Sequence, residues 1–223
     1  MSAKKPLEDF KVVDFSMVYA GPICARMLSD NGADVIKIEP LGIGDTIRAN
    51  TRIFSHFNAG KKSIQIDLSH KKGQALAIKL IEDADILIEN YRPGIMARFG
   101  LDYASLKERF PKLIYCSISG FGQTGPYAGR GGFDLIANAM SGLMAINGPK
   151  DGPPFRIPMP VSDVCAGMHA AIGILLALNN RQITGSGQYI DTSLFEAGIS
   201  LGVYEAASVF ATGEVPERLG QAH

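Results

Sequence analysis

The chain has few cysteines and no excess of charge of either sign. Among its 223 residues the cysteines are Cys24, Cys116 and Cys165, and no Cys-x-x-Cys pair occurs. An odd number of widely spaced cysteines argues against a disulfide scaffold and a structural zinc site. Each lies in an apolar stretch, which predicts buried thiols in a reducing, cytoplasmic setting. Basic and acidic residues balance at 22 each, so no nucleic acid partner is expected.

Long apolar runs are also missing. Lys4 and Lys5 are not followed by one, which argues against a signal peptide. The longest apolar stretch, residues 164–178, is shorter than the roughly 20 residues of a membrane-spanning helix. We therefore expect a buried core helix there, with His169 as a satisfied core histidine, and no membrane partner. The four histidines form no His-x-His or His-Glu-x-x-His arrangement, so no metal site is expected.

What the sequence does contain is an alternation of short apolar, β-branched runs with longer segments of helical periodicity. Near-continuous apolar strands separated by helices are typical of a parallel sheet covered on both faces. The pattern predicts a Rossmann-like, doubly wound, mostly parallel α/β fold, in which ligands bind beyond the carboxyl ends of the strands. The predicted strands are 11–16, 34–39, 63–68, 85–89 and 113–119, and the predicted helices are 22–31, 71–82 and 105–110.

The second half begins with a glycine-rich loop at 120–132 and continues with mostly helical patterns. We divide the chain into a large domain at 1–195 and a helix with a linker at 196–223. Residues 214–223 show no periodicity. The elements predicted here are a helix at 134–145, an irregular proline-rich stretch at 147–160, a helix at 163–180, a strand at 189–192 and a helix at 194–212.

Two features suit chemistry, and each has a structural alternative. The loop at 120–132 suits phosphate binding through its backbone N–H groups, or is rich in glycine only because it turns tightly, and the residues leave these interpretations balanced. No G-x-G-x-x-G or P-loop motif follows the first strand, so NAD and P-loop nucleotides are weakly supported. Asp163 is either the N-cap of its helix, which its position alone favours, or an ionised nucleophile stabilised by helix N–H groups.

Five cations lie at or just beyond predicted strand ends, where side chains that bind phosphate are found in such folds. For each one alone, a solvated surface charge is the commoner role. Their shared placement at one edge of the predicted sheet favours phosphate binding. These residues are Lys61, Lys62, Arg92, Arg98 and Arg130.

Seven segments, in this order along the chain, resemble the family III CoA-transferases, a group that includes formyl-CoA transferase, carnitine CoA-transferases and the α-methylacyl-CoA racemases. Each segment alone is a weak signal, whereas the ordered set is specific and spans most of the chain. The segments are VDFSMVYAGP at 13–22, GADVIKIE at 32–39, KKSIQIDL at 61–68, DILIENYRPG at 85–94, IYCSISGFGQTGP at 114–126, SDVCAG at 162–167 and TGSGQYID at 184–191.

The resemblance implies a Rossmann-like large domain that binds coenzyme A, with Asp163 as the catalytic aspartate. Members of the family transfer CoA from an acyl-CoA to a small carboxylic acid through an aspartyl-CoA thioester, without a metal. The CoA-contacting positions of the family fall on Tyr19, Ala20, Ile66, Asp67, Leu68, Ser69, Asn90, Tyr91, Arg92, Arg98, Arg130, Gly131, Gly132 and Phe133.

Two positions depart from patterns within the family. Where the racemases carry a histidine that transfers a proton, this chain has Phe133, which cannot take up a proton, so an acyl-CoA racemase or epimerase is the weaker alternative. Where formyl-CoA transferase has an arginine after the second strand, this chain has Pro40, and we do not expect that contact.

The chain is also short for this family, whose members continue into a small second domain and form interlocked homodimers. It ends about where that second domain begins in the family. We therefore expect an apparently truncated, N-terminal portion that dimerises when full length. A CoA-binding fragment without activity is the non-enzymatic alternative.

Overall fold

The computed structural model describes residues 4–221, and its centre is one sheet of six strands. The spatial order is β3-β2-β1-β4-β5-β6, and every neighbouring pair runs parallel. This is the strand order of the Rossmann fold, in which the winding reverses between β1 and β4. The predicted doubly wound α/β fold is therefore confirmed. The strands are β1 (Lys11–Asp14), β2 (Asp34–Pro40), β3 (Lys62–Ile66), β4 (Ile86–Glu89), β5 (Ile114–Ser119) and β6 (Tyr189–Ser193).

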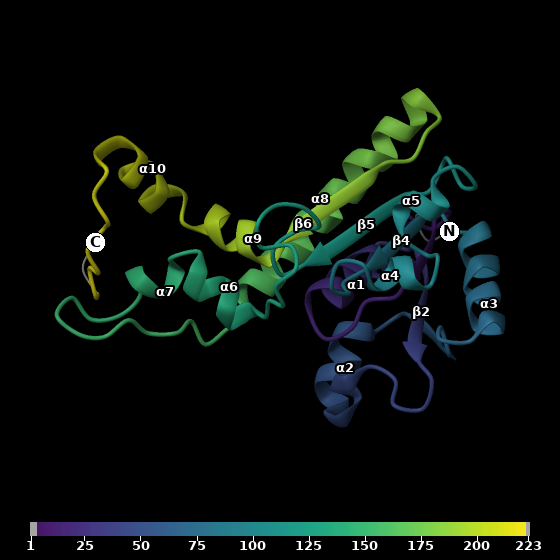
Figure 1. The fold of residues 1–223 in the computed structure, drawn as a ribbon, viewed down its shortest axis with the longest axis horizontal. Coiled ribbons are helices and arrows are strands. Elements are labelled where there is room, and N and C mark those ends of the chain that lie inside the picture. Colours follow the sequence, from purple (N-terminus) through teal and green to yellow (C-terminus); the bar gives the residue numbers. More distant parts are fainter. Residues whose placement is uncertain (1–3, 222–223) are drawn as a thin grey trace.

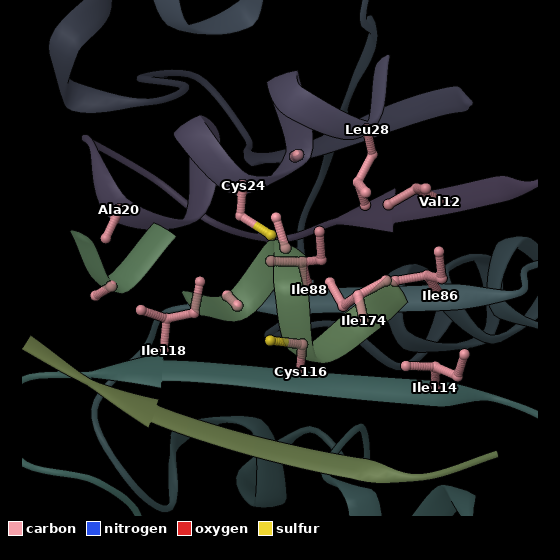
Figure 2. Packing of buried hydrophobic residues seen from close by; sticks show 14 of the residues in the cluster. Val12, Ala20, Cys24, Leu28, Ile86, Ile88, Ile114, Cys116, Ile118 and Ile174 are labelled. Carbon is pink, nitrogen blue, oxygen red and sulfur yellow. The ribbon is translucent and has the colours of Figure 1, made fainter. Parts of the chain in front are cut away.

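Helices cover both faces of the sheet because alternate residues of the central strands point to opposite sides. On one face Ile86 and Ile88 pack with α1 (Ala20–Asp30) and α8 (Val161–Thr184). Figure 2 shows Ile174 of α8 lying among Cys24, Cys116 and the strand residues. On the other face Leu87 packs with α3 (Lys71–Glu82) and α5 (Tyr103–Leu106).

Several helices differ from the sequence prediction. The 3-10 helix η1 (Thr46–Ala49), α2 (Thr51–Asn58) and α4 (Ile95–Arg98) were not predicted, and α5 begins two residues earlier than expected. The helix expected at 134–145 is two helices, α6 (Asp134–Met140) and α7 (Leu143–Ile146), because Gly142 takes a left-handed φ of 88° between them.

The helix expected at 194–212 is likewise interrupted. The structure has α9 (Leu194–Leu201) and α10 (Val203–Thr212), bent by 78° at Gly202. Figure 1 shows α6, α7, α9 and α10 extending from one end of α8, away from the sheet. The C-terminal segment is attached there, because Arg218 donates hydrogen bonds to the carbonyls of Ala145, Pro149 and Gly152.

The helix α8 is longer than predicted and only one side of it is buried. It packs against α1, α9, β5 and β6, and it ends at Gly185, whose φ of 74° supplies a left-handed cap. Among residues 4–221 it is the one unbroken helix with the length and composition of a membrane span, and α9 with α10 meets that test only as a bent pair. A core helix passes the same test.

Two predictions about side chains on α8 are wrong. His169 is exposed and lies 3.6 Å from the Sγ atom of Cys165, so it is not a core histidine. Cys24 and Cys116 are buried as predicted, but Cys165 is only half-buried. His169 lies on the exposed side of α8, whereas Cys165 is partly covered by α9, whose Ser200 Oγ lies 3.8 Å from its Sγ.

Candidate active site

A cavity of about 450 Å³ lies at the carboxyl ends of the strands, at the point where the winding of the sheet reverses. One wall is the segment 17–20, which follows β1, and Asn90 follows β4. Ser119 ends β5, and Asp163 enters from the first turn of α8. This is where ligands bind in open parallel sheets.

Asp163 is not the N-cap of its helix. The helix begins at Val161 after Pro160, which supplies no side-chain cap. The cap comes instead from Asp134, whose Oδ1 accepts hydrogen bonds from the backbone N–H groups of Ser162 at 2.8 Å and Asp163 at 3.2 Å. Because Asp134 takes over capping, the carboxylate of Asp163 is left without a hydrogen bond among residues 4–221.

Asp134 is itself held by a closed ring of side chains. The Oγ of Ser162 donates to Oδ1 of Asn138 at 2.7 Å, and Nδ2 of Asn138 donates to Oδ2 of Asp134 at 2.7 Å. Ser162 and Asn138 are fully buried. The ring fixes the start of α8 against α6, and with it the backbone from which the Asp163 side chain leaves.

The surroundings of Asp163 favour its neutral form more than the sequence suggested. Burial, followed by the nearby negative charge of Asp134, raises the pKa of Asp163 to about 7. The expectation that helix N–H groups would keep this carboxyl ionised is therefore wrong, because the first-turn N–H groups already donate to Asp134. Near neutral pH both the protonated and the ionised forms of Asp163 are populated.

The wall after β1 is attached to the strand next to it. The side chain of Asn90 accepts from the N–H of Met17 at 2.8 Å and donates to its carbonyl at 2.7 Å. This occupies the amide of Asn90 and leaves its backbone for the expected CoA contact. Tyr19 packs edge-on against Phe57 of α2, with ring centroids 5.0 Å apart, and Ala20 begins α1 beside it.

The glycine-rich loop returns across the end of β5 with backbone in direct contact. A Cβ on Gly132 would lie 2.7 Å from the Cα of Gly120, so neither position has room for a side chain. A Cβ on Gly131 would lie 2.7 Å from a guanidinium nitrogen of Arg92, which is the flexible end of its side chain. Arg130 stacks over the ring of Tyr127, 4.4 Å from its centroid. The backbone contact explains Gly120 and Gly132 structurally, whether or not the loop also holds phosphate.

Three cavities follow one another along this edge of the sheet. Tyr91 lines both a cavity of about 430 Å³ and a smaller one of about 230 Å³, and Asn90 lines both the smaller cavity and that of Asp163. The cavity of about 430 Å³ is lined by Ile66, Asp67, Leu68 and Ser69. The cavity of about 230 Å³ is lined by Arg92, Arg130, Gly132 and Phe133.

The predicted cations do not all reach this series of cavities. Arg98 is exposed on α4 and lines none of the three. The prediction that Lys61 binds phosphate is wrong, because its side chain is 1% exposed and its Nζ lies 2.9 Å from Oδ2 of Asp14. Lys62 pairs with Asp34 at the beginning of β2, away from the carboxyl edge.

Sequence reasoning did not single out Asp134 or Arg156, which also line the Asp163 cavity. Asp134 precedes an apolar helix much as Asp163 does, and that shared pattern was an available signal. Arg156 lies in the proline-rich stretch at 147–160, where no periodicity marks it. Within the described residues there is no group of three or more histidine, cysteine, aspartate or glutamate side chains placed to hold a metal.

Comparison with known proteins identifies the family of the chain. The family model described as CoA-transferase family III matches residues 7–223. A succinate–glutarate CoA-transferase of Agrobacterium fabrum is 40% identical over 234 residues, which cover 99% of this chain and 58% of that protein. An acetyl-CoA:oxalate CoA-transferase of Acetobacter aceti is 40% identical over 228 residues, with 99% and 59% covered.

A solved structure of similar sequence has the same fold and is also longer than this chain. The crystal structure of a CAIB/BAIF family protein from Brucella suis superposes with a TM-score of 0.95 at 39% identity, and the match covers 99% of this chain and 61% of that one. The chain thus spans about three fifths of the length of these relatives. It belongs to CoA-transferase family III.

Proposed function

We propose that the protein transfers CoA from an acyl-CoA to a carboxylic acid, with Asp163 as the nucleophile that carries CoA between them. The observation that carries this proposal is the carboxylate of Asp163, which no residue of the described chain engages, in a cavity of about 450 Å³ at the switch point of the sheet. Two relatives named for CoA transfer between acids support the reaction class.

The three neighbouring cavities, which share lining residues, support an extended binding site for CoA. The cavity around Ile66 and Leu68 takes the nucleotide, since its apolar walls suit a base and it is the farthest from Asp163 along the series. Arg92 and Arg130 in the smaller cavity pair with the phosphates. The pantetheine arm then passes Asn90 and places the thioester beside Asp163.

The reaction proceeds by exchange between thioesters and anhydrides. The Asp163 carboxylate attacks the thioester carbonyl, the C–S bond breaks, and a mixed anhydride and CoA thiolate form. The thiolate attacks the aspartyl carbonyl, which releases the donor acid and leaves an aspartyl-CoA thioester. The acceptor carboxylate attacks that thioester, and the released thiolate attacks the acceptor carbonyl of the second anhydride. Acyl-CoA leaves and the Asp163 carboxylate is restored without net proton transfer.

Phe133 supports transfer over racemisation in this cavity. It lines the same cavity as Asp163 and is 69% exposed, so its ring faces open space beside the nucleophile. A racemase needs a second proton-transfer group on the opposite side of the α-carbon, and an aromatic ring cannot serve.

Arg156 supports a dicarboxylic substrate. It is the one cation among the residues that line the Asp163 cavity, which Asp134 also lines. No hydrogen bond or ion pair engages its guanidinium within residues 4–221. A second carboxylate on the acid would be repelled by the two aspartates unless a cation paired with it. The relatives named for succinate, glutarate and oxalate fit such acids.

Trapping tests the role of Asp163. Incubation with an acyl-CoA followed by hydroxylamine is expected to convert Asp163 to a hydroxamate, detected by peptide mass spectrometry. Asp163→Ala is expected to lose the label and to lower transfer by about a thousandfold or more. Asp151→Ala, at an exposed carboxylate outside the cavity, serves as the control. Undiminished transfer by Asp163→Ala would rule out this mechanism.

Acceptor specificity tests Arg156. Arg156→Gln is expected to raise KM for a dicarboxylic acceptor by roughly 10- to 100-fold, because a charge-assisted pair is lost. For a monocarboxylic acid of the same length KM should change by less than about threefold. Arg52→Gln, at an exposed residue of α2, is the control. Equal losses for both acids would show that Arg156 does not read the second carboxylate.

We also propose that the protein acts as a homodimer. The outward face of α8 carries Val164, Met168, Ile172, Leu175 and Leu176, whose side chains are 37% to 64% exposed. A continuous apolar stripe of this length on one helix is typical of a protein–protein interface. We propose that the same stripe on a second copy of the chain covers it.

A further inference from the structure

Val18 has a backbone conformation that its side chain disfavours. It is the one non-glycine residue among 4–221 with a positive φ, at 70°. A β-branched residue in the left-handed region is an outlier, since its Cβ crowds the neighbouring carbonyl. Such conformations persist only where the surroundings impose them, and they gather at functional sites. Val18 lines the Asp163 cavity.

Three consecutive residues before α1 are each held by a side chain. The N–H of Ser16 donates to Asp14 at 2.9 Å, and Met17 is bound by Asn90. The N–H of Val18 donates to both carboxylate oxygens of Asp45, each at 3.2 Å. The turn is therefore fixed from three directions, and Asp45 acts on the strained residue itself.

The side chain of Asp45 is buried and held in one position, unlike a mobile surface carboxylate. Its side chain is 0% exposed and lies 3.1 Å from Nζ of Lys37, which is 1% exposed. Its backbone N–H donates to Oε2 of Glu39 at 2.8 Å. A buried carboxylate with a buried counter-ion has little freedom, so it can hold the Val18 N–H in one direction.

The turn at Val18 is connected to the helix of the nucleophile. Two residues later, the carbonyl of Ala20 touches α8 at Gly167, where a Cβ would lie 2.6 Å from the oxygen. Gly167 is one helical turn after Asp163 on α8. A change of φ at Val18 would redirect Tyr19 and Ala20 and move this contact.

We propose that Asp45 is a positioning residue for the transfer reaction, which holds Val18 in its left-handed conformation and so sets the wall of the cavity against Asp163. The inference rests on the proposed function. Its structural alternative is that Asp45 serves only as the N-cap of η1, where it accepts from the N–H of Ile47 at 3.2 Å. The positioning role predicts that the effect of an Asp45 substitution on the reaction rate depends on the residue at position 18, and the capping role predicts that it does not.

The experiment is a double-mutant cycle in a Lys37→Met background, which removes the buried counter-charge from every variant. Asp45→Asn keeps an oxygen that can accept from Val18, and Asp45→Ala removes it. Each is combined with Val18 and with Val18→Gly, because glycine takes a positive φ without strain. The measurements are the single-turnover rate of thioester formation at Asp163 from acyl-CoA, and the Kd of CoA by calorimetry.

With Val18 present, Asp45→Ala is expected to react 10- to 100-fold more slowly than Asp45→Asn, with Kd for CoA changed by less than about threefold. In the Val18→Gly background the same comparison should shrink to less than about threefold. An equal ratio in both backgrounds would overturn the proposal in favour of a capping role. If Lys37→Met with Asp45→Asn forms no thioester at all while the natural sequence does, the carboxylate charge is required and the hydrogen-bond account fails.

The natural sequence supplies the check that separates this inference from the proposed function. If it forms no thioester at Asp163, the transferase proposal fails, whatever Asp45 does. Should Asp45→Ala fail to fold, thermal unfolding of Val18→Gly alone decides. Relief of strain predicts a melting temperature equal to or above that of the natural sequence, and a clear decrease would contradict it.

Discussion

At the residue scale, two carboxyl groups near the carboxyl edge of the sheet have raised pKa values, and burial is the main cause for both. Burial and the charge of Asp134 raise the pKa of Asp163 to about 7. Burial is also the main cause that raises the pKa of Glu89 to about 7, at the end of β4. Glu89 is 4% exposed and accepts from the N–H of Tyr91. Asp163 lines the cavity of about 450 Å³ and accepts no hydrogen bond within residues 4–221, whereas the Glu89 carboxylate is already engaged by the N–H of Tyr91.

The raised pKa of Asp163 predicts how stability depends on pH. Between about pH 4 and 7 the folded protein keeps a proton on Asp163 that the unfolded chain has released, so this group lowers stability as pH rises. Asp163→Asn removes the effect. At about pH 8 the variant should be more stable by on the order of 1–2 kcal/mol, and at about pH 4 the difference should vanish.

Urea unfolding at both pH values measures this difference. Asp151→Asn is the control, because Asp151 is exposed on the loop before α8. A stability gain at acidic pH that disappears at alkaline pH would reverse the sign and contradict the assignment.

At the element scale, the elements predicted well are those whose signal is local. Residues of β4 and β5 are buried throughout, so their unbroken apolar runs identified them. The helix α2 was missed because it spans only eight residues and Asn58 is its one buried residue, although Ile53, Phe54 and Phe57 share one side of it. It begins instead from Asn50, whose side chain accepts from the N–H of Ile53.

The active site was predictable in position but not in its supporting contacts. Asp163 and the strand-end residues follow from the order of motifs and from the rule for parallel sheets. The cap of α8 comes from Asp134, which lies 28 residues before Ser162, and a local pattern cannot show such a partner. The breaks at Gly142 and Gly202 were missed because an isolated glycine in a helical pattern is often tolerated.

The contact between Gly120 and Gly132 predicts an asymmetry within the glycine-rich loop. Gly132→Ala would place a Cβ 2.7 Å from Gly120, against backbone that cannot yield cheaply. It should weaken CoA binding about tenfold or more and lower the melting temperature by a few degrees. Gly129→Ala meets nothing within 4 Å and should change neither. Calorimetry with CoA and thermal unfolding give both readings, and equal effects would refute the packing argument.

At the scale of the whole molecule, the sheet and the helices on its two faces form one layered body, while α6, α7, α9 and α10 extend from the beginning of α8 (Figure 1). The division predicted at residue 195 falls inside α9, which packs against α8 and α6. The boundary remains a prediction. The helix α8 is common to both parts, since it carries Asp163 at one end and the apolar stripe along its length.

The apolar stripe predicts association in solution. Light scattering coupled to gel filtration should give twice the mass of one chain. The double variant Ile172→Glu with Leu176→Glu should give a single chain, because two buried charges oppose an apolar interface. Lys72→Glu, at an exposed residue of α3 on the other face, controls for added charge. A monomeric natural sequence, or an unchanged mass for the double variant, would contradict the homodimer.

The placement of Asp163 and Val164 next to each other on α8 has a consequence for which insertions and deletions evolution can accept. One faces the cavity and the other faces outward, and successive helical residues differ by about 100°. A single inserted residue in the first turn of α8 would rotate the chemical and the apolar faces out of place together. In the exposed stretch around Asp151 to Phe155, the same insertion would be absorbed by the loop. Length variation among descendants of this sequence should therefore gather before the helix and avoid its first turn.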